Sequence, residues 1–371
     1  MQTIYRCACI VVLLTAGCGK NQRAIEMSEP EGELRVNVGG EELMLVPSSA
    51  SAERVDQLGL STKGREDASH VLTPPKNLPK HDSDQERDYR PEDAVEWVID
   101  IEFEGSPVLT AAEIAKCFDQ EWLNENGRPT IFGWSPEINR WTCLLSADSP
   151  KTFTKLALGW ELFKSYDEKY SITSSDMHRF QSATQGQAAT LGNPTLKLNR
   201  TTQEAEALSA AIQESVVTCN RDAVIILRSP HKAPFDGREV WDVMMSLGLR
   251  WGDGDLFHWQ NDADFGHDMF FSVETSTSPG YFLPEHIVAG SSRFDDLVFG
   301  FSIPRSADPI TVLDSMLRAV SYAKKRLGGE IVDRNGKPLD ESQIRRETKA
   351  IVDQLRATGF EPGATATLHV F

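Results

Sequence analysis

The sequence predicts an α+β fold, an antiparallel sheet covered by helices on one face, and this prediction rests mainly on residues 222–355. Segments in which apolar residues recur every second position, as in strands, alternate there with segments in which they recur about every 3.6 positions, as in helices. The resulting element order is β-α-β-β-β-α followed by a helical hairpin. A net charge of -17 over 371 residues, with no basic stripe, argues against a nucleic-acid-binding surface.

Each expected element has a local signal. The apolar run Asp222–Leu227 is the first strand, and the pattern GREVWDVMMSLGL after it is a helix. After a turn at WGDGD, the runs LFHW, FFSV and VFGFSI supply three further strands. Asp308-Pro309 caps the next helix and Gly328-Gly329 ends it. The stretch ESQIRRETKAIVDQLRATGF predicts a last helix, and the alternation in Ala364–Phe371 is compatible with an edge strand.

Five motifs follow one another in this segment: DAVIIL, LRWGDGDLFHW, FFSVETSTSPGYF, FSIP and KKRLGGEIVD. In order and spacing they resemble the C-terminal domain of the bacterial cell-division protein family ZipA. The resemblance covers a little over a third of the chain. It implies a sheet whose helix-free face receives the C-terminal tail of FtsZ, the tubulin-like division protein.

The resemblance also implies a peptide-binding groove on that face. The residues expected to form it are Val224, Ile226, Asp253, Leu256, Ser276, Val298 and Gly300. Some positions depart from the family pattern: Gly254 and Ser276 stand in place of methionines, Ser278 of a lysine, Glu274 of an alanine, and Gly300 of a phenylalanine. Apolar anchors of this kind are typically worth ~1 to 3 kcal/mol each, so the fold is expected to be kept while the family's ligand is in question.

Residues 94–219 resemble a second, degenerate copy of the same domain, so we expect the fold to be duplicated in tandem, with residues 220–371 as the other copy. The order of strands and helices repeats. In this match TLKLNRTTQEAEALSAAIQESVV corresponds to VFGFSIPRSADPITVLDSMLRAV, and Ser165–Asn193 is an insertion without a counterpart. An unrelated α+β domain is the alternative.

The N-terminus predicts a lipoprotein signal peptide over residues 1–17 and lipidation of Cys18. Cys7–Leu14 is apolar, and the small residues Thr15-Ala16-Gly17 precede the cysteine. Thirteen residues separate Arg6 from Lys20, fewer than the ~20 that a helix needs to cross a bilayer. The protein is therefore expected to be anchored to a membrane of the cell envelope. The alternative is an uncleaved anchor in the inner membrane, as in the ZipA family, with the C-terminal domain in the cytoplasm.

Residues 18–93 are expected to be an acidic, disordered tether, because they are rich in charged residues, serine and proline and poor in aromatic residues. Within this tether residues 33–46, ELRVNVGGEELMLV, alternate around Gly39-Gly40 and predict a β-hairpin. A single hairpin is marginally stable, so we expect it to be either mobile or docked on a later sheet.

Signals of catalysis are missing from the sequence. Cys117, Cys143 and Cys219 have no zinc-binding spacing and are expected to be buried thiols. The densest cluster of potential ligands, DGDLFHWQNDADFGHD at residues 253–268, fits no EF-hand or zinc-helix pattern and predicts a solvated turn. We therefore expect no metal, no cofactor and no enzyme activity.

Two functions remain open. The first is a membrane-tethered, non-catalytic ZipA-like interaction protein that acts in cell division at the septum, with FtsZ or another extended peptide lying across the sheet. The second is a structural or scaffolding lipoprotein of the envelope, in which the two copies cover each other's open faces and FtsZ is not bound. Burial of Val224, Ile226 and Leu256 against the first copy would favour the second function.

Overall fold

The structure is a computed structural model that describes residues 34–38, 41–45, 48–61, 66–79, 90–144, 150–164, 172–231, 233–263 and 265–371. The predicted signal peptide 1–17 and Cys18 lie outside these residues. The chain divides into one unit that ends at Pro47 and another from Ser48 to Phe371. In the first unit, β1 (Leu34–Val38) pairs antiparallel with β2 (Glu41–Leu45), so the hairpin predicted at residues 33–46 is present.

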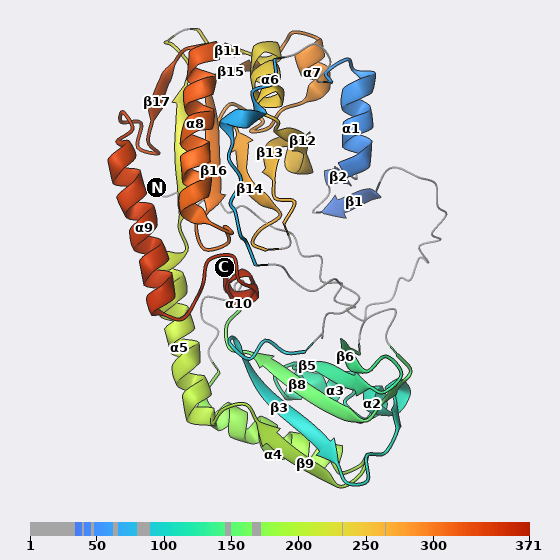
Figure 1. Cartoon of the computed structure of the whole chain (residues 1–371). Coiled ribbons are helices and arrows are strands. Elements are labelled where there is room, and N and C mark those ends of the chain that lie inside the picture. The colour runs from blue at the N-terminus through green and yellow to red at the C-terminus, as the bar shows by residue number, and fades with distance from the viewer. Residues whose placement is uncertain are drawn as a thin grey trace. The chain divides into compact units, whose positions relative to one another are not determined.

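Within the unit Ser48–Phe371, we call residues 220–371 the second domain. These residues contain a six-stranded sheet of order β12-β13-β14-β16-β10-β17 (Figure 1). Its strands are β10 (Asp222–Arg228), β12 (Arg250–Gly252), β13 (Leu256–Gln260), β14 (Met269–Glu274), β16 (Asp296–Ser302) and β17 (Glu330–Val332). Neighbouring strands are antiparallel throughout. The mixed α+β class with an antiparallel sheet, predicted from the sequence, is confirmed.

Helices pack on one face of this sheet. They are α6 (Gly237–Ser246), α7 (Pro284–Val288), α8 (Pro309–Leu327) and α9 (Glu341–Ala357), with a short 3-10 turn η2 (Asp253–Asp255). Burial along β10 alternates: Ala223, Ile225 and Leu227 enter the helix-side core, whereas Val224 and Ile226 are partly exposed. Asp308 caps α8 by accepting from the Thr311 amide at 3.1 Å, and Gly328 ends that helix at φ 80°, as the sequence predicted.

In the same unit, we call residues 90–219 the first domain; they comprise the predicted segment 94–219 and the four residues before it. They contain a five-stranded sheet of order β6-β5-β8-β3-β9. Its strands are β3 (Glu96–Phe103), β5 (Thr130–Ser135), β6 (Arg140–Cys143), β8 (Lys155–Glu161) and β9 (Pro194–Leu198), and its helices are α2 (Ala111–Cys117), α3 (Gln120–Glu125), α4 (Ser174–Ala188) and α5 (Thr202–Cys219). The helices contribute to one core with Trp97, Ile99 and Ile101 of β3. Cys117 and Cys219 are buried there as thiols, while Cys143 is only partly buried.

Each sheet contains a central antiparallel strand pair, and the two pairs have the same register. In the first domain Val98 of β3 lies opposite Gly159 of β8, and in the second Val224 of β10 lies opposite Gly300 of β16. Each domain also has a two-residue strand pair beside its sheet, β4 (Leu109–Thr110) with β7 (Thr152–Phe153) and β11 (Phe235–Asp236) with β15 (Arg293–Phe294).

This register shows that one strand correspondence predicted from the sequence was wrong. From the sequence, the strand in TLKLNR was expected to take the place of VFGFSI. In the structure β8 takes that place, because it pairs with β3 as β16 pairs with β10. The segment Ser165–Asn193, expected to be an insertion, contains α4. Strand β9 occupies the edge next to β3, as β17 does next to β10.

The C-terminus differs from the sequence prediction. Residues 364–371, compatible with an edge strand by their alternation, instead form a helix, α10 (Thr365–Val370). Val370 of this helix and Leu355 of α9 are buried in the core of the first domain, whereas Val352 of α9 belongs to the core of the second. The C-terminal helices therefore contribute to both cores.

Part of the predicted disordered tether, residues 18–93, is folded instead. Helix α1 (Ser48–Gln57), residues 58–61 and residues 66–79 with the 3-10 turn η1 (Ser69–Val71) pack on the second domain (Figure 1). We call residues 48–61 and 66–79 the strap. Val55, Leu60 and Leu72 are buried in the core of the second domain. Composition predicted disorder because these few apolar residues are spread among many polar ones.

Polar contacts fix the path of the strap over the helices. The Leu60 carbonyl accepts from the buried Trp241 indole at 3.0 Å, which satisfies a donor that would otherwise lack a partner. Arg54 forms two hydrogen bonds of 2.7 and 2.8 Å with the Glu285 carboxylate, and its guanidinium lies 5.4 Å from the Trp251 ring centre. Further along, Arg318 of α8 donates to the Val71 carbonyl at 2.9 Å.

We predict that Leu60→Ala lowers the free energy of unfolding by ~2 to 5 kcal/mol, because it opens a cavity where the side chain is fully buried. Urea unfolding of the full chain, followed by tryptophan fluorescence, measures the change. Val288→Ala is the matched control, since Val288 is 47% exposed and its truncation should cost less than ~0.5 kcal/mol. Equal effects of the two substitutions would show that the strap is not part of the core.

Candidate functional site

The face of the second sheet opposite the helices is the candidate site predicted from the sequence. Antiparallel pairing places Val224 beside Gly300 and Ile226 beside Val298, so these four residues form two adjacent cross-strand pairs. Strand β14 extends both pairs, with Ser272 opposite Gly300 and Glu274 opposite Val298. Side chains of paired residues share a face, and this face is therefore a mixed apolar and polar surface.

The apolar residues of this surface remain partly exposed. Val224, Ile226, Leu256 and Val298 are all of intermediate burial. None of them belongs to the core clusters formed by the described residues. Val224, Ile226 and Val298 are neighbours, whereas strand β14 with the exposed Glu274 separates them from Leu256. Neighbouring, partly exposed apolar side chains are a typical feature of a binding surface.

The other two predicted residues lie at the margins. Asp253 is exposed in η2, and its carbonyl accepts from Nε2 of His258 at 2.8 Å. Ser276 follows β14 and is also exposed; its amide donates to the Asp296 carboxylate at 2.7 Å, and its hydroxyl contacts the same carboxylate. Ser276 is thus held by a neighbouring strand instead of pointing to a ligand as an apolar anchor would.

Carboxylates give this surface an acidic character. Burial raises the pKa of Glu274, and the nearby carboxylates of Asp296 and Asp222 raise it further. Burial also raises the pKa of Asp222, while Arg334 lowers it. A ligand that brings a positive charge next to Glu274 would relieve this repulsion.

The Asp- and His-rich segment at residues 253–268 is more ordered than a solvated turn. His258 is buried and joins Ser272 of β14 to the Asp253 carbonyl, each at 2.8 Å, and burial lowers its pKa. Asn261 donates to the carbonyls of Phe265 and His267 at 2.8 and 2.9 Å. Among the described residues, no group of three or more His, Cys, Asp or Glu side chains is arranged to hold a metal ion.

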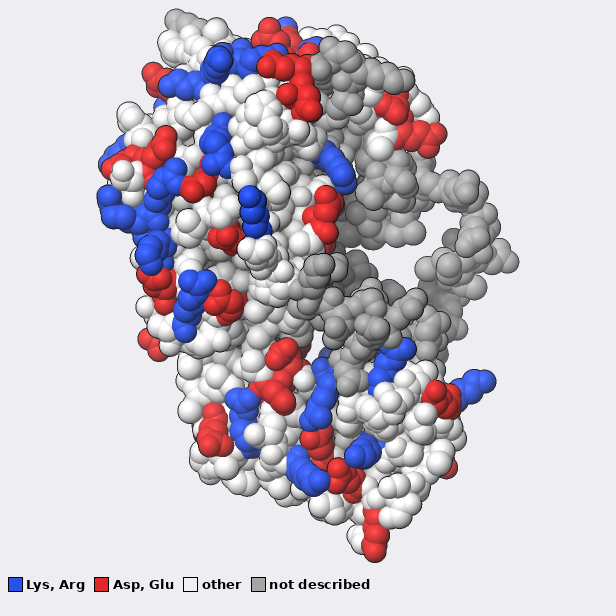
Figure 2. All heavy atoms as spheres, in the orientation of Figure 1, with Lys and Arg blue, Asp and Glu red and all other residues white. Residues whose placement is uncertain are grey.

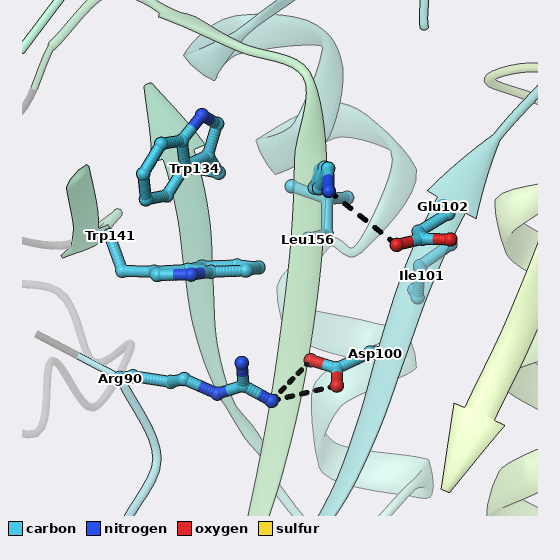
Figure 3. Close-up of a pocket in the computed structure, with 8 residues that line it drawn as sticks. Arg90, Asp100, Ile101, Glu102, Trp134, Trp141 and Leu156 are labelled. Carbon is cyan, nitrogen blue, oxygen red and sulfur yellow. Dashed lines mark hydrogen bonds and ion pairs between the residues drawn. The ribbon is translucent and has the colours of Figure 1, made fainter. Parts of the chain in front are cut away.

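The open face of the first sheet was not predicted from the sequence as a site. It carries Phe132 and Trp134 of β5 and Trp141 of β6, which pack against Val98 and Ala157. Beside the two tryptophans is a hollow of about 210 Å³, whose lining includes Leu156, Lys155 and Glu102 (Figure 3). The sequence signal was the alternation in TIFGWS and RWTC, which places aromatic residues on one face of each strand.

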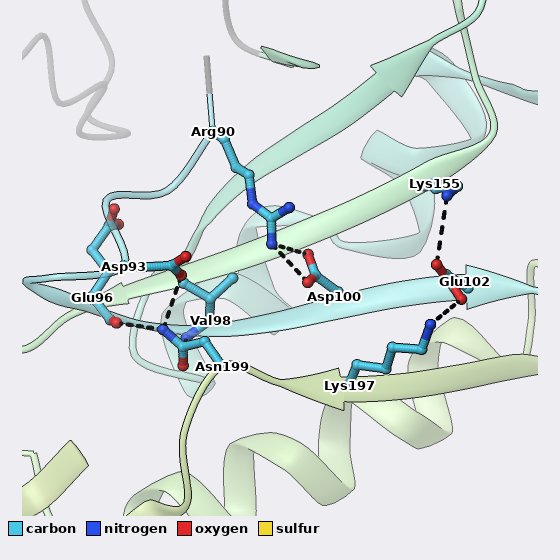
Figure 4. A network of polar contacts seen from close by, with 9 residues as sticks. All are labelled: Arg90, Asp93, Glu96, Val98, Asp100, Glu102, Lys155, Lys197 and Asn199. Atoms are coloured by element: carbon cyan, nitrogen blue, oxygen red, sulfur yellow. Dashed lines mark hydrogen bonds and ion pairs between the residues drawn. The ribbon is translucent and has the colours of Figure 1, made fainter. Parts of the chain in front are cut away.

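Charged residues form a row along the same face (Figure 4). Glu102 of β3 lies between Lys197 of β9 at 2.6 Å and Lys155 of β8 at 3.5 Å. Arg90 donates through one nitrogen to both Asp100 carboxylate oxygens, at 2.9 and 2.7 Å. These ion pairs are partly exposed, so each contributes little to stability, although together they order the surface.

Glu96, on the same face, is a buried carboxyl group. It sits at the start of β3, opposite Glu161 of β8, and accepts from the Glu92 amide. Burial raises its pKa to about 7, and the negative charges of Glu161, Glu92 and Asp93 add to this effect. The residue therefore titrates near neutral pH.

Together these observations define the class of the second domain as an antiparallel sheet backed by helices on one face, with a mixed apolar and polar surface on the other. Residues 222–350 match the family model described as ZipA, C-terminal FtsZ-binding domain. The resemblance predicted from the sequence is thus confirmed for this segment.

Curated relatives agree with the family match. A protein named Cell division protein ZipA from Pseudomonas aeruginosa (strain LESB58) is 27% identical over 137 residues, which are 36% of this chain and 47% of that protein. Proteins of the same name from Stutzerimonas stutzeri (strain A1501) and Shewanella loihica are each 26% identical, over 173 and 98 residues. They cover 47% and 26% of this chain, and 60% and 29% of the relatives. The chain spans about half the length of the first of these relatives.

We predict that the stability of the wild-type chain falls as the pH rises from about 4.5 through about 7, because the folded state holds the proton of Glu96 more tightly than the unfolded state does. Glu96→Gln should remove this part of the pH dependence. Urea midpoints at pH 5 and pH 8 measure it. Glu206→Gln, at an exposed position of α5, is the control, and a Glu96→Gln profile parallel to that of the wild type would contradict the assignment.

Proposed function

We propose that the second domain binds an extended peptide on the open face of its sheet, and that the chain is a non-catalytic, ZipA-like interaction protein of cell division. The observation that best supports this is the partial exposure of Val224, Ile226, Leu256 and Val298 on the helix-free side. In the scaffolding alternative the first domain would bury these residues, yet none of them joins a core cluster of the described residues.

The C-terminal tail of FtsZ is the first partner to test, because the matching family model is described as FtsZ-binding. The surface has fewer apolar anchors than the family pattern implies, with Glu274 and Gly300 in its centre. If each missing anchor removes ~2 kcal/mol, the dissociation constant rises roughly 30-fold per anchor. We therefore expect the tail to bind weakly, and a peptide with a basic residue near Glu274 to bind better.

The charge distribution supports a protein partner over a nucleic acid. On the face of the molecule seen in Figure 2, lysine and arginine are interspersed with aspartate and glutamate, without a continuous basic patch. Nucleic-acid binding depends on clustered positive charge.

We also propose that Cys18 anchors the chain to a membrane through lipid. The support is the apolar run and small residues before Cys18 in the sequence. Among the helices that the structure describes, none combines the length and the apolar character that crossing a membrane requires. A domain outside the cytoplasmic membrane cannot meet FtsZ. If Cys18 is lipidated and the domain lies there, its ligand is another extended peptide of the envelope.

We further propose that the two domains arose by tandem duplication. The support is the shared register, with Val98 opposite Gly159 and Val224 opposite Gly300, and the short strand pair beside each sheet. The two sheets differ in the strands between the shared pair: β5 and β6 lie between β3 and β8 in the chain, whereas β12, β13 and β14 lie between β10 and β16.

We predict that Ile226→Asp abolishes binding of an FtsZ tail peptide to the full chain, because it places a charge beside Val298, in the apolar part of the surface. Fluorescence anisotropy of the labelled peptide measures the affinity. Ile310→Asp is the matched control: Ile310 is 38% exposed in the first turn of α8, on the side of the sheet that the helices cover, and should leave binding unchanged.

Gly300→Phe tests the same surface with a substitution that should increase the affinity for the peptide. A Cβ atom on Gly300 would lie 3.5 Å from Val224, an ordinary contact, so the strand accepts a side chain there. Restoring the aromatic anchor should strengthen peptide binding ~10-fold or more. If neither the Ile226 nor the Gly300 substitution changes binding, the peptide does not bind on this surface.

We predict that Cys18→Ser releases the protein from the membrane fraction, because the thiol that carries the lipid is lost. Fractionation of cells that express the wild type or the variant, with metabolic labelling by a fatty-acid analogue, measures this. Cys117→Ser is the control, since that thiol is buried in the first domain. A variant that stays in the membrane would identify the N-terminus as an uncleaved anchor.

A further inference from the structure

A segment of the chain already lies across the open face of the first sheet. Arg90 reaches over the face to Asp100 of β3, and its guanidinium lies 5.2 Å from the Trp141 ring centre (Figure 3). Pro91 covers the central strand at Gly159, where an added Cβ atom would come within 3.0 Å of the proline. We call residues Arg90–Asp93 the arm.

The remainder of the arm is held by main-chain contacts. The Glu92 amide donates to the buried Glu96 carboxyl group, and the Asp93 carbonyl accepts from Arg200. The Asn199 side chain donates to the Asp93 carboxylate at 3.1 Å and accepts from the Val98 amide of β3 at 3.0 Å (Figure 4). The arm therefore follows a path defined by polar groups on both sides.

The part of the first sheet that the arm covers is structurally equivalent to the candidate site of the second domain. Pro91 lies over the Val98–Gly159 pair, and the Val224–Gly300 pair holds the same register in the second sheet. In the second sheet this position is partly exposed, whereas Val98 is fully buried. One of the two faces is thus covered by a segment of the chain itself, in which Arg90 and Pro91 lead into a turn that begins at Glu92. Arg90 also lines the hollow beside Trp134 and Glu102.

We propose that the open face of the first sheet is a second peptide-binding surface, which the chain occupies with its own arm as an intramolecular ligand. The external ligand that fits is an extended segment with an arginine followed by a proline. The arginine lies between the Asp100 carboxylate and the Trp141 ring, where ion pairing and cation–π attraction both act. The proline occupies the space above Gly159, which any side chain at that position would fill.

The arm competes with such a ligand by virtue of its attachment. A tethered segment acts at an effective concentration of ~1 mM for short linkers, so a free peptide of similar affinity cannot displace it at micromolar concentration. The Arg90 side chain is 36% exposed, so its ion pair is screened and replaceable. Weakening the arm should therefore expose the surface to a peptide in trans.

The test compares the wild-type full chain with Arg90→Ser/Pro91→Gly. The probe is the capped peptide Gly-Ser-Arg-Pro-Glu-Asp-Ala, and the control peptide has Ser-Gly in place of Arg-Pro. Fluorine NMR of chains labelled with 5-fluorotryptophan reports binding at Trp141, whose signal is assigned with Trp141→Phe. We expect the arm variant to bind the Arg-Pro peptide at least tenfold more tightly than the wild type does, and the control peptide to bind neither.

Two further variants locate the effect. Adding Asp100→Asn to the arm variant should abolish peptide binding, whereas adding Ile226→Asp, on the other sheet, should leave it unchanged. Circular dichroism melting checks that each variant folds, and Arg90→Ser alone replaces the double variant if that one does not. Equal affinities of wild type and arm variant, equal affinities for the two peptides, or insensitivity to Asp100→Asn would each overturn the proposal.

Discussion

The antiparallel register between two central strands is the constraint on which both domains depend. Because side chains alternate along a strand, the pairing of Val224 with Gly300 sends Ile225 and Phe299 into the core and leaves their neighbours on the open face. A slip of one residue would exchange the two sets and place apolar bulk in solvent. The register of this strand pair therefore determines both which side chains pack in the core and which lie on the open face.

This constraint explains why the second domain could be predicted well from the sequence. Strands β10 and β16 alternate in burial at every residue, and β14 does so apart from the buried pair Phe270 and Phe271. Helix α8 has a capping aspartate, a proline and a terminal glycine. The residues Val224, Ile226, Val298 and Gly300 could be placed on one face for the same reason. Their degree of exposure could not, because it depends on which other elements pack nearby.

Other features could not be predicted because their signals are short or non-local. The strap contributes few buried side chains and owes its path to main-chain contacts, such as the one between Leu60 and Trp241, that leave no trace in composition. Helix α10 is six residues long, and the alternation of its threonines resembles a strand. The face of the first sheet combines residues from β3, β5, β6 and β8 with Arg90, and only the folded chain shows them together.

The interleaved path of the chain bears on the order in which the protein can fold during synthesis. The strap is made first, yet its apolar residues belong to the core of the second domain, most of which is made after residue 220. The first domain is made in between, but its core includes Leu355, Phe360 and Val370 from the end of the chain. The core of the second domain needs Val352 and that of the first needs Val370, so both stay incomplete until almost all of this sequence has left the ribosome. A nascent chain stalled near residue 350 would expose apolar surface on both sheets and would be a substrate for chaperones.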